Sequence, residues 1–174
     1  MGSLAVQYAV KVAGFSRVIG VCSANNADLV KGLASDPKCT VEVIDYAKGA
    51  LSSQIALGSV DYVFDTVTSP EDPDYTDEAR KVLKDGGFLT QINSKNPLKM
   101  GVAMTGLSWP QRNYDVLMAD VSQNTLNCFS QLINTGAVRP LVLDPPRPFS
   151  HASVEEGFTS LKGRRQKGKV VFDF

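Results

Sequence analysis

Residues 1–22, MGSLAVQYAVKVAG followed by FSRVIGVC, decide the fold of this chain. Over Met1–Gly14 the apolar residues recur at helical spacing, and the final glycine suits a C-terminal cap, so we expect an amphipathic helix. Arg17–Cys22 is a short apolar run that is typical of a buried strand. A helix that leads into a buried strand, with no strand before it, indicates a βαβ unit without its first strand.

The composition is that of a soluble globular protein. With 174 residues the chain fits one domain, and 43% hydrophobic and 21% charged residues are enough for a packed core and a polar surface. Eighteen basic residues balance eighteen acidic residues, which argues against a nucleic-acid-binding protein.

The three cysteines, Cys22, Cys39 and Cys128, are far apart in the sequence. An odd number without a framework fits free thiols in a reducing compartment, and their spacing does not suit a metal site, so we expect none. No apolar run approaches the roughly 20 residues of a membrane span, and no signal peptide is recognisable. We therefore expect a cytoplasmic protein that binds neither membrane nor nucleic acid.

Helical and strand patterns alternate along the chain, which predicts a doubly wound α/β domain with a mostly parallel sheet and helices on both faces. The strongest strand is Val60–Val67 (VDYVFDTV), whose nearly continuous apolarity predicts burial on both faces. The other expected strands are Arg17–Cys22, Val41–Tyr46, Phe88–Asn93, Val102–Trp109, Val138–Leu143 and Val170–Phe174. The other expected helices are Ala27–Leu33, Ala50–Leu57, Tyr75–Leu83, Tyr114–Asn134 and Ser153–Leu161, and Asp144–Phe149 is expected to be a proline-rich loop.

The order of these segments resembles the cofactor-binding half of medium-chain dehydrogenase/reductases, in the zinc-independent quinone oxidoreductase and enoyl reductase branch. The stretches that carry the resemblance are GSLAVQYA, RVIGVCSANNADLVKGL, VEVIDY, VDYVFDTV, ARKVLKDGGFLTQINS and EEGFTSLKGRRQKGKVVFDF. The resemblance implies a single Rossmann-like domain over residues 1–174, truncated before its first strand. It also implies that the helix and strand in 150–174 return to a catalytic domain that this sequence lacks.

The resemblance places the missing strand in the middle of the sheet, where its loss leaves two buried strands with unpaired backbone groups. Three alternatives stay open for this position: the terminal strand Val170–Phe174 fills it, a partner chain fills it, or the chain is a truncated product. The glycine-rich phosphate loop that precedes the first helix in this family is reduced to Gly2.

By position, the resemblance implies a binding site for NADPH at the carboxyl ends of the strands. The implied cofactor-binding residues are Gly2, Ser3, Ser23, Asn25, Tyr46, Thr66, Val67, Ile92, Asn93 and Ser94. Neither an acid nor a base stands at Ser23–Asn25, and Lys31 is the nearest base, so NADP is only mildly favoured over NAD.

Each of these assignments has a structural alternative. Ser23 and Asn25 also suit helix caps, Tyr46 suits a half-buried aromatic at a sheet edge, and Asn93 suits a turn.

Candidates for catalysis are few. Asn93 is one, and His151, the only histidine, is the other, because its unperturbed pKa suits proton transfer near neutral pH. The alternative for His151 is a surface residue at a helix start. The basic turn of Lys162, Arg164, Arg165, Lys167 and Lys169 is either a phosphate contact or a solvated linker.

The resemblance therefore predicts an NAD(P)H-dependent reductase that transfers hydride to an electron-poor C=C bond or a quinone in a hydrophobic small molecule. Two other hypotheses are a cofactor-independent enzyme, such as a cyclase or isomerase, and a non-catalytic module that dimerises or binds a partner. In related dimers an edge strand pairs across a two-fold axis, so we expect a homodimer through about Val102–Trp109.

Overall fold

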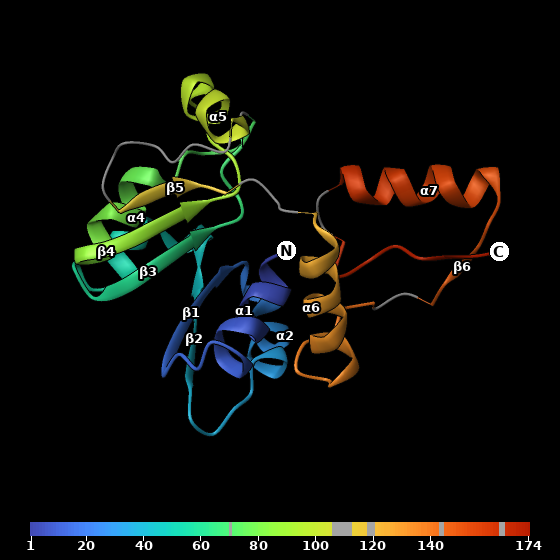
Figure 1. Cartoon of the computed structure of the whole chain (residues 1–174), viewed down its shortest axis with the longest axis horizontal. Helices are drawn as coiled ribbons and strands as arrows, with labels where there is room; N and C mark the ends of the chain where they lie inside the picture. The colour runs from blue at the N-terminus through green and yellow to red at the C-terminus, as the bar shows by residue number, and fades with distance from the viewer. Residues whose placement is uncertain (70, 106–112, 118–120, 143–144, 164–165) are drawn as a thin grey trace.

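The computed structural model describes residues 1–69, 71–105, 113–117, 121–142, 145–163 and 166–174 (Figure 1). Helices and strands alternate along most of the chain, as the sequence predicts. The elements are α1 (Gly2–Lys11), β1 (Arg17–Cys22), η1 (Ala24–Asn26), α2 (Ala27–Leu33), β2 (Thr40–Asp45), η2 (Tyr46–Lys48), α3 (Leu51–Gln54), β3 (Val60–Asp65), α4 (Thr76–Val82), β4 (Leu83–Gln91), α5 (Pro97–Met104), β5 (Tyr114–Val116), α6 (Gln123–Asn134), β6 (Arg147–Pro148), α7 (His151–Lys162) and β7 (Phe172–Asp173). None of these helices is both long and apolar enough to cross a membrane.

The strands form separate parallel sheets rather than one continuous sheet. β1 pairs with β2, and β3, β4 and β5 pair in that order. Within the described part of the chain, β1 and β3 each have a single strand neighbour, so each presents one backbone edge without a sheet partner. The α/β fold with parallel strands is confirmed, and its sheet is divided where the missing strand is expected.

The terminal strand does not fill the gap. β7 pairs in parallel with β6, with Arg147 opposite Phe172 and Pro148 opposite Asp173. The two short strands form a unit with α7 that lies across α6 from the two larger sheets (Figure 1). The first of the three alternatives for the central position is therefore wrong. The expected loop at 144–149 instead contributes β6.

A buried hydrophobic cluster packs against the three-stranded sheet. Side chains from α4, β4, α5 and β5 form it, and Val63 of β3 packs against it. Its buried members are Ala79, Leu89, Ala103, Tyr114 and Val116.

β3 is buried on one face only, which corrects the prediction of burial on both faces. Asp65 is buried, whereas Tyr62 and Phe64, which alternate with the inward residues, are 44% and 37% exposed. Tyr62 makes cross-strand contacts with β4: its ring stacks on Phe88 at 6.3 Å between centroids, and its hydroxyl donates to Thr90 Oγ1 at 2.8 Å.

The helix expected over Tyr114–Asn134 divides into a strand and a shorter helix. Tyr114 and Val116 are 3% and 4% exposed and alternate with a half-buried residue, so this stretch has the period of a strand and pairs with β4. Ser122 starts α6, because its hydroxyl accepts a hydrogen bond from the Thr125 N–H at 3.3 Å.

Two further expected strands are also wrong in the described residues. Val102–Met104, the start of the expected dimer strand, is the end of α5, which Asn96 caps by accepting from the N–H groups of Leu98 and Lys99. Residues 106–112 of that prediction lie outside the described residues, and dimerisation through this region stays a prediction. In place of a strand over Val138–Leu143 there is an isolated antiparallel bridge between Val142 and Gly168.

Other boundaries shift by a few residues. α1 ends at Lys11, and Gly14, at φ 70°, turns the chain toward β1 instead of capping the helix. α3 is limited to Leu51–Gln54, and β4 begins at Leu83, before the expected Phe88.

Candidate functional site

The first side of the candidate site is the junction between α1 and the end of β3. A Cβ built on Gly2 would stand 3.7 Å from Thr66 Oγ1, an ordinary contact distance. The amino end of α1 therefore lies beside the residue that follows β3. This junction brings together Gly2 and Thr66, two of the predicted cofactor-binding residues, although they are far apart in the sequence. Because Gly2 has no side chain, its backbone faces Thr66 directly.

Asp65 shapes the loop that carries Thr66 and Val67. Its Oδ1 accepts hydrogen bonds from the N–H groups of Val67 at 2.8 Å and Thr68 at 3.0 Å. Its Oδ2 accepts from the Thr68 hydroxyl at 2.5 Å. Because Asp65 is 9% exposed, these bonds are shielded from water and fix the backbone directly after β3.

A buried glutamine connects this loop to the next strand end. Gln91 is fully buried; its amide nitrogen donates to Asp65 Oδ2 at 2.8 Å, and its Oε1 accepts from the Tyr114 hydroxyl at 2.7 Å. Burial raises the pKa of Tyr114, which keeps this hydroxyl a proton donor at neutral pH. The backbone N–H of Ile92 donates to the Asp65 carbonyl at 3.2 Å. Asp65, Gln91 and Tyr114 thus form a polar network across three strands, which holds the segment at Ile92 against the loop at Thr66.

The sequence analysis missed this network. Its signal was present, since Asp65 and Gln91 are polar residues inside two expected strands. A buried polar side chain requires partners, and those of Gln91 come from β3, β5 and α4.

Asn93 and Ser94 lie in the irregular segment that follows β4. Asn93 Oδ1 accepts a hydrogen bond from the Ser94 N–H at 2.8 Å, and Ser94 Oγ accepts one from the Asn96 N–H at 3.2 Å. The Asn93 side chain thus bonds to the next residue along the chain, and neither Asn93 nor Ser94 is part of a regular turn, so the turn-forming alternative for Asn93 stays a prediction. Ser94 is 7% exposed, whereas Asn93 is half-buried at the carboxyl end of the strand.

The ends of β1 and β2 carry the other predicted residues. Ser23 occupies the N-cap position of η1 but makes no side-chain capping hydrogen bond there. Asn25 is exposed, and its carbonyl oxygen accepts a hydrogen bond from Lys167 Nζ at 3.2 Å, from 142 residues away in the sequence. The Oδ1 of Asn26 is buried and has no hydrogen-bond donor in the described residues. The Tyr46 side chain is 53% exposed, which is a larger exposed fraction than the alternative of a half-buried aromatic at a sheet edge predicts.

His151 and Ser3 complete the list of predicted residues. His151 begins α7 and is exposed, in the unit that lies across α6 from the sheets (Figure 1). This position matches the surface alternative. Ser3 lies in the first turn of α1, where its carbonyl oxygen accepts a hydrogen bond from Gln7 Nε2 at 3.0 Å.

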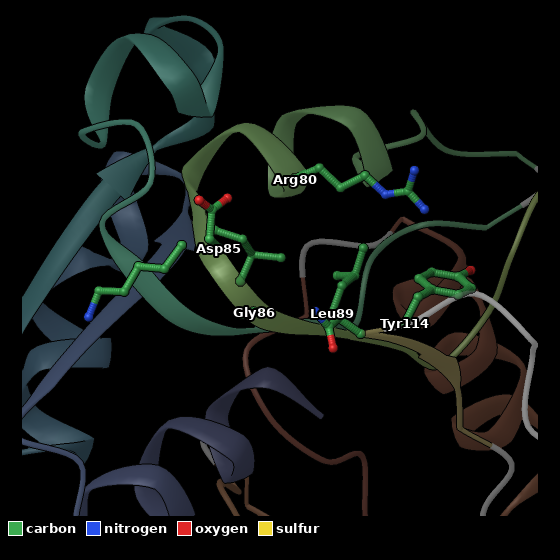
Figure 2. A pocket seen from close by; sticks show the side chains of 9 residues that line it. Arg80, Asp85, Gly86, Leu89 and Tyr114 are labelled. Carbon is green, nitrogen blue, oxygen red and sulfur yellow. The ribbon is translucent and has the colours of Figure 1, made fainter.

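A pocket of about 310 Å³ lies at the opposite end of β4 (Figure 2). It lies between α4 and the amino ends of β4 and β5, and Arg80, Asp85 and Tyr114 line it. Arg80 reaches over it from α4, with its guanidinium carbon 5.8 Å from the centre of the Tyr114 ring (Figure 2). Because Thr66 and Asn93 follow the carboxyl ends of the strands, this pocket is not part of the candidate site.

Comparison with known proteins gives a family match over most of the chain. The sequence pattern of a family described as zinc-binding dehydrogenase matches residues 41–172. An NADPH-dependent alkenal/one oxidoreductase from the chloroplast of Arabidopsis thaliana and a 2-methylene-furan-3-one reductase from Solanum lycopersicum are each 30% identical over 171 residues. The match covers 98% of this chain and 37% of each relative, so the chain spans little more than a third of the curated relatives' length.

Solved structures give the same fold. The quinone oxidoreductase from Coxiella burnetii superposes with a TM-score of 0.72 at 22% identity, over 98% of this chain and 48% of that one. The crystal structure of AibC gives a TM-score of 0.59 at 22% identity, over 95% of this chain and 46% of that one. The Rossmann-like fold that the sequence predicts is therefore confirmed.

Proposed function

The chain belongs to the zinc-binding dehydrogenase family, and from this premise we propose that it binds NADPH and serves the reduction of an electron-poor C=C bond or a quinone. The observation that carries the proposal is the junction of Gly2 with Thr66, which sets the amino end of α1 beside the carboxyl end of β3. In open α/β sheets, ligands bind at the carboxyl ends of the strands, and helix N-termini there favour phosphate groups. The names of the two plant relatives, an NADPH-dependent oxidoreductase and a reductase, support the same chemistry.

The residues of this edge fit a dinucleotide. Gly2 and Ser3 offer backbone at the start of α1, a ten-residue helix, for the pyrophosphate. Ser23, Asn25 and Tyr46 stand at the ends of β1 and β2, on the proposed adenosine side. Thr66, Val67, Ile92, Asn93 and Ser94 follow β3 and β4, on the proposed nicotinamide side. When bound, NADPH supplies the hydride.

The protein's own groups then orient the reactants. The network of Asp65, Gln91 and Tyr114 fixes the backbone on the nicotinamide side and so favours one binding geometry. The substrate class we propose is a hydrophobic small molecule. Asn93 is the polar contact that we propose for it, because Asn93 follows the carboxyl end of β4.

The described residues do not fit a zinc site. Nowhere in the described ranges do three or more His, Cys, Asp or Glu side chains come together in a way that could hold a metal ion. We therefore assign no step to zinc.

Titration of the purified chain with NADPH, followed by nucleotide fluorescence and thermal shift, tests the proposal. We expect saturable binding that raises the melting temperature. No binding at millimolar NADPH would contradict the proposal and would direct attention to the cofactor-independent hypothesis.

Gly2→Asp is the matching variant. It adds a negative charge where the phosphates are proposed to lie, so we expect NADPH affinity to fall about tenfold or more. Gly2→Ala is the control, because its Cβ meets only Thr66 Oγ1 at an ordinary 3.7 Å. Equal affinity of the Asp and Ala variants would remove Gly2 from the proposed site.

A further inference from the structure

We propose that Lys167 is the residue that selects NADPH over NADH, by contacting the 2′-phosphate at the carboxyl end of β1. The inference rests on the proposed dinucleotide site and goes beyond it by naming a specificity residue. It begins from a contact between distant parts of the chain: Lys167 Nζ donates a hydrogen bond to the Asn25 carbonyl oxygen at 3.2 Å.

In Rossmann-like folds the residue that meets the adenosine ribose lies about 20 positions after the phosphate-binding glycines, and its charge decides between the two nucleotides. Counted from Gly2, this position falls at the end of β1. An acid that binds the ribose hydroxyls selects NAD, whereas a base accommodates the 2′-phosphate of NADP. Residues 22–26, Cys-Ser-Ala-Asn-Asn, contain neither an acid nor a base. The C-terminal turn therefore brings to this position a charge that the local sequence lacks.

Lys167 has donors left for a phosphate. An ammonium group has three N–H donors, and the bond to Asn25 uses one of them. The side chain is exposed, so a nucleotide reaches it without displacing core residues. The nearest acid on the neighbouring strand is Asp45, opposite Cys22, and its Oδ1 already accepts the Ala47 N–H at 3.0 Å.

The backbone beside Lys167 is held firmly. Gly168 has φ 109°, a conformation that L residues rarely adopt, and a Cβ there would stand 2.5 Å from the Leu141 carbonyl oxygen. The Lys169 N–H donates to the same oxygen at 2.7 Å. Because this close approach anchors the turn, Lys167 is presented to the end of β1 by a fixed backbone and not by a free terminus.

The test compares Lys167→Gln, Lys167→Arg and a control, Lys162→Gln, which removes the same charge from the exposed end of α7. Affinities are measured for NADPH and NADH, and for 2′,5′-ADP and 5′-AMP, which differ only in the 2′-phosphate. We expect Lys167→Gln to weaken NADPH and 2′,5′-ADP about three- to tenfold and to leave NADH and 5′-AMP unchanged. Lys167→Arg and Lys162→Gln are expected to bind like the wild type.

The outcomes separate this inference from the proposed function. If the wild type binds NADPH and Lys167→Gln binds it equally well, or loses NADPH and NADH to the same extent, the inference is wrong and the dinucleotide site stands. If the wild type binds neither nucleotide, the proposed function fails and the inference fails with it.

Discussion

Asp65 is the single residue on which the geometry of the candidate site depends most. Its carboxylate accepts hydrogen bonds from two backbone N–H groups, the Thr68 hydroxyl and the Gln91 amide. Asp65→Asn replaces one acceptor oxygen by an N–H₂ group that faces donors, so we expect the free energy of unfolding to fall by about 2–4 kcal/mol. Urea unfolding followed by circular dichroism measures this free energy.

Asp61→Asn is the control on the same strand: the Asp61 side chain is 76% exposed, and we expect a change within about 0.5 kcal/mol. Equal effects of the two variants would contradict the structural role of Asp65.

The sequence identifies residues whose position follows from local pattern and misses those whose role depends on distant partners. The sequence predicts Thr66 and Asn93 at the carboxyl ends of their strands, and the structure has them just beyond the ends of β3 and β4, because the end of a strand is visible in the sequence to within a residue or two. The buried state of Gln91 depends on β3 and β5, and the contact of Lys167 depends on a residue 142 positions away. No local pattern contains that information.

At the scale of elements, Glu78 joins α3 to α4. Its carboxylate accepts hydrogen bonds from the N–H and the hydroxyl of Ser52 and pairs with Lys81 at 2.6 Å. The hydrogen bond from Lys81, followed by those from Ser52, lowers the pKa of Glu78 from an ordinary 4.5 to about 2. A lowered carboxylate pKa stabilises the fold above the unfolded-state pKa, and this contribution is lost as pH falls through the folded-state value. We expect stability to decline between pH 4.5 and about 2, and Glu78→Gln to decline less in this window. Urea midpoints at pH 6 and pH 3 check it; the same acid sensitivity in both proteins would contradict it.

Helices and strands whose apolar residues recur at a regular spacing are predictable from the sequence, and those with a mixed spacing are not. The strands β1 and β3 and the helices α2 and α4 lie close to their expected ranges. Tyr114–Val116 was wrongly joined to the following helix, because a stretch of three residues is too short to show alternation and only its pairing with β4 makes it a strand. Val102–Met104 was wrongly assigned to a strand for a different reason. Pro97 and the cap at Asn96 start a helix several residues earlier, and this helix continues through Met104.

The whole molecule is divided at the position where the sequence analysis expects a strand to be missing. The order of elements indicates the missing strand and the family resemblance gives its central position, and both agree with the separate sheets β1–β2 and β3–β4–β5. The sequence could not decide what occupies the position, because the terminal strand and a partner chain can pair with the same backbone groups, and truncation leaves these groups unpaired. The pairing of β7 with β6 removes one of them.

The division predicts that the two sheets differ in stability. Leu89 of β4 is 1% exposed in the core under the larger sheet, whereas Val21 of β1 is 43% exposed. We expect native-state amide exchange to protect β3–β5 more strongly than β1–β2, because local stability follows buried apolar contact. Leu89→Ala should lower the free energy of unfolding by about 3 kcal/mol and speed exchange mainly in β3–β5. Val21→Ala, the matched variant in the smaller sheet, should cost about 1 kcal/mol or less. Uniform protection across both sheets, with Leu89→Ala accelerating exchange equally everywhere, would mean instead that the two separate sheets unfold as one cooperative unit.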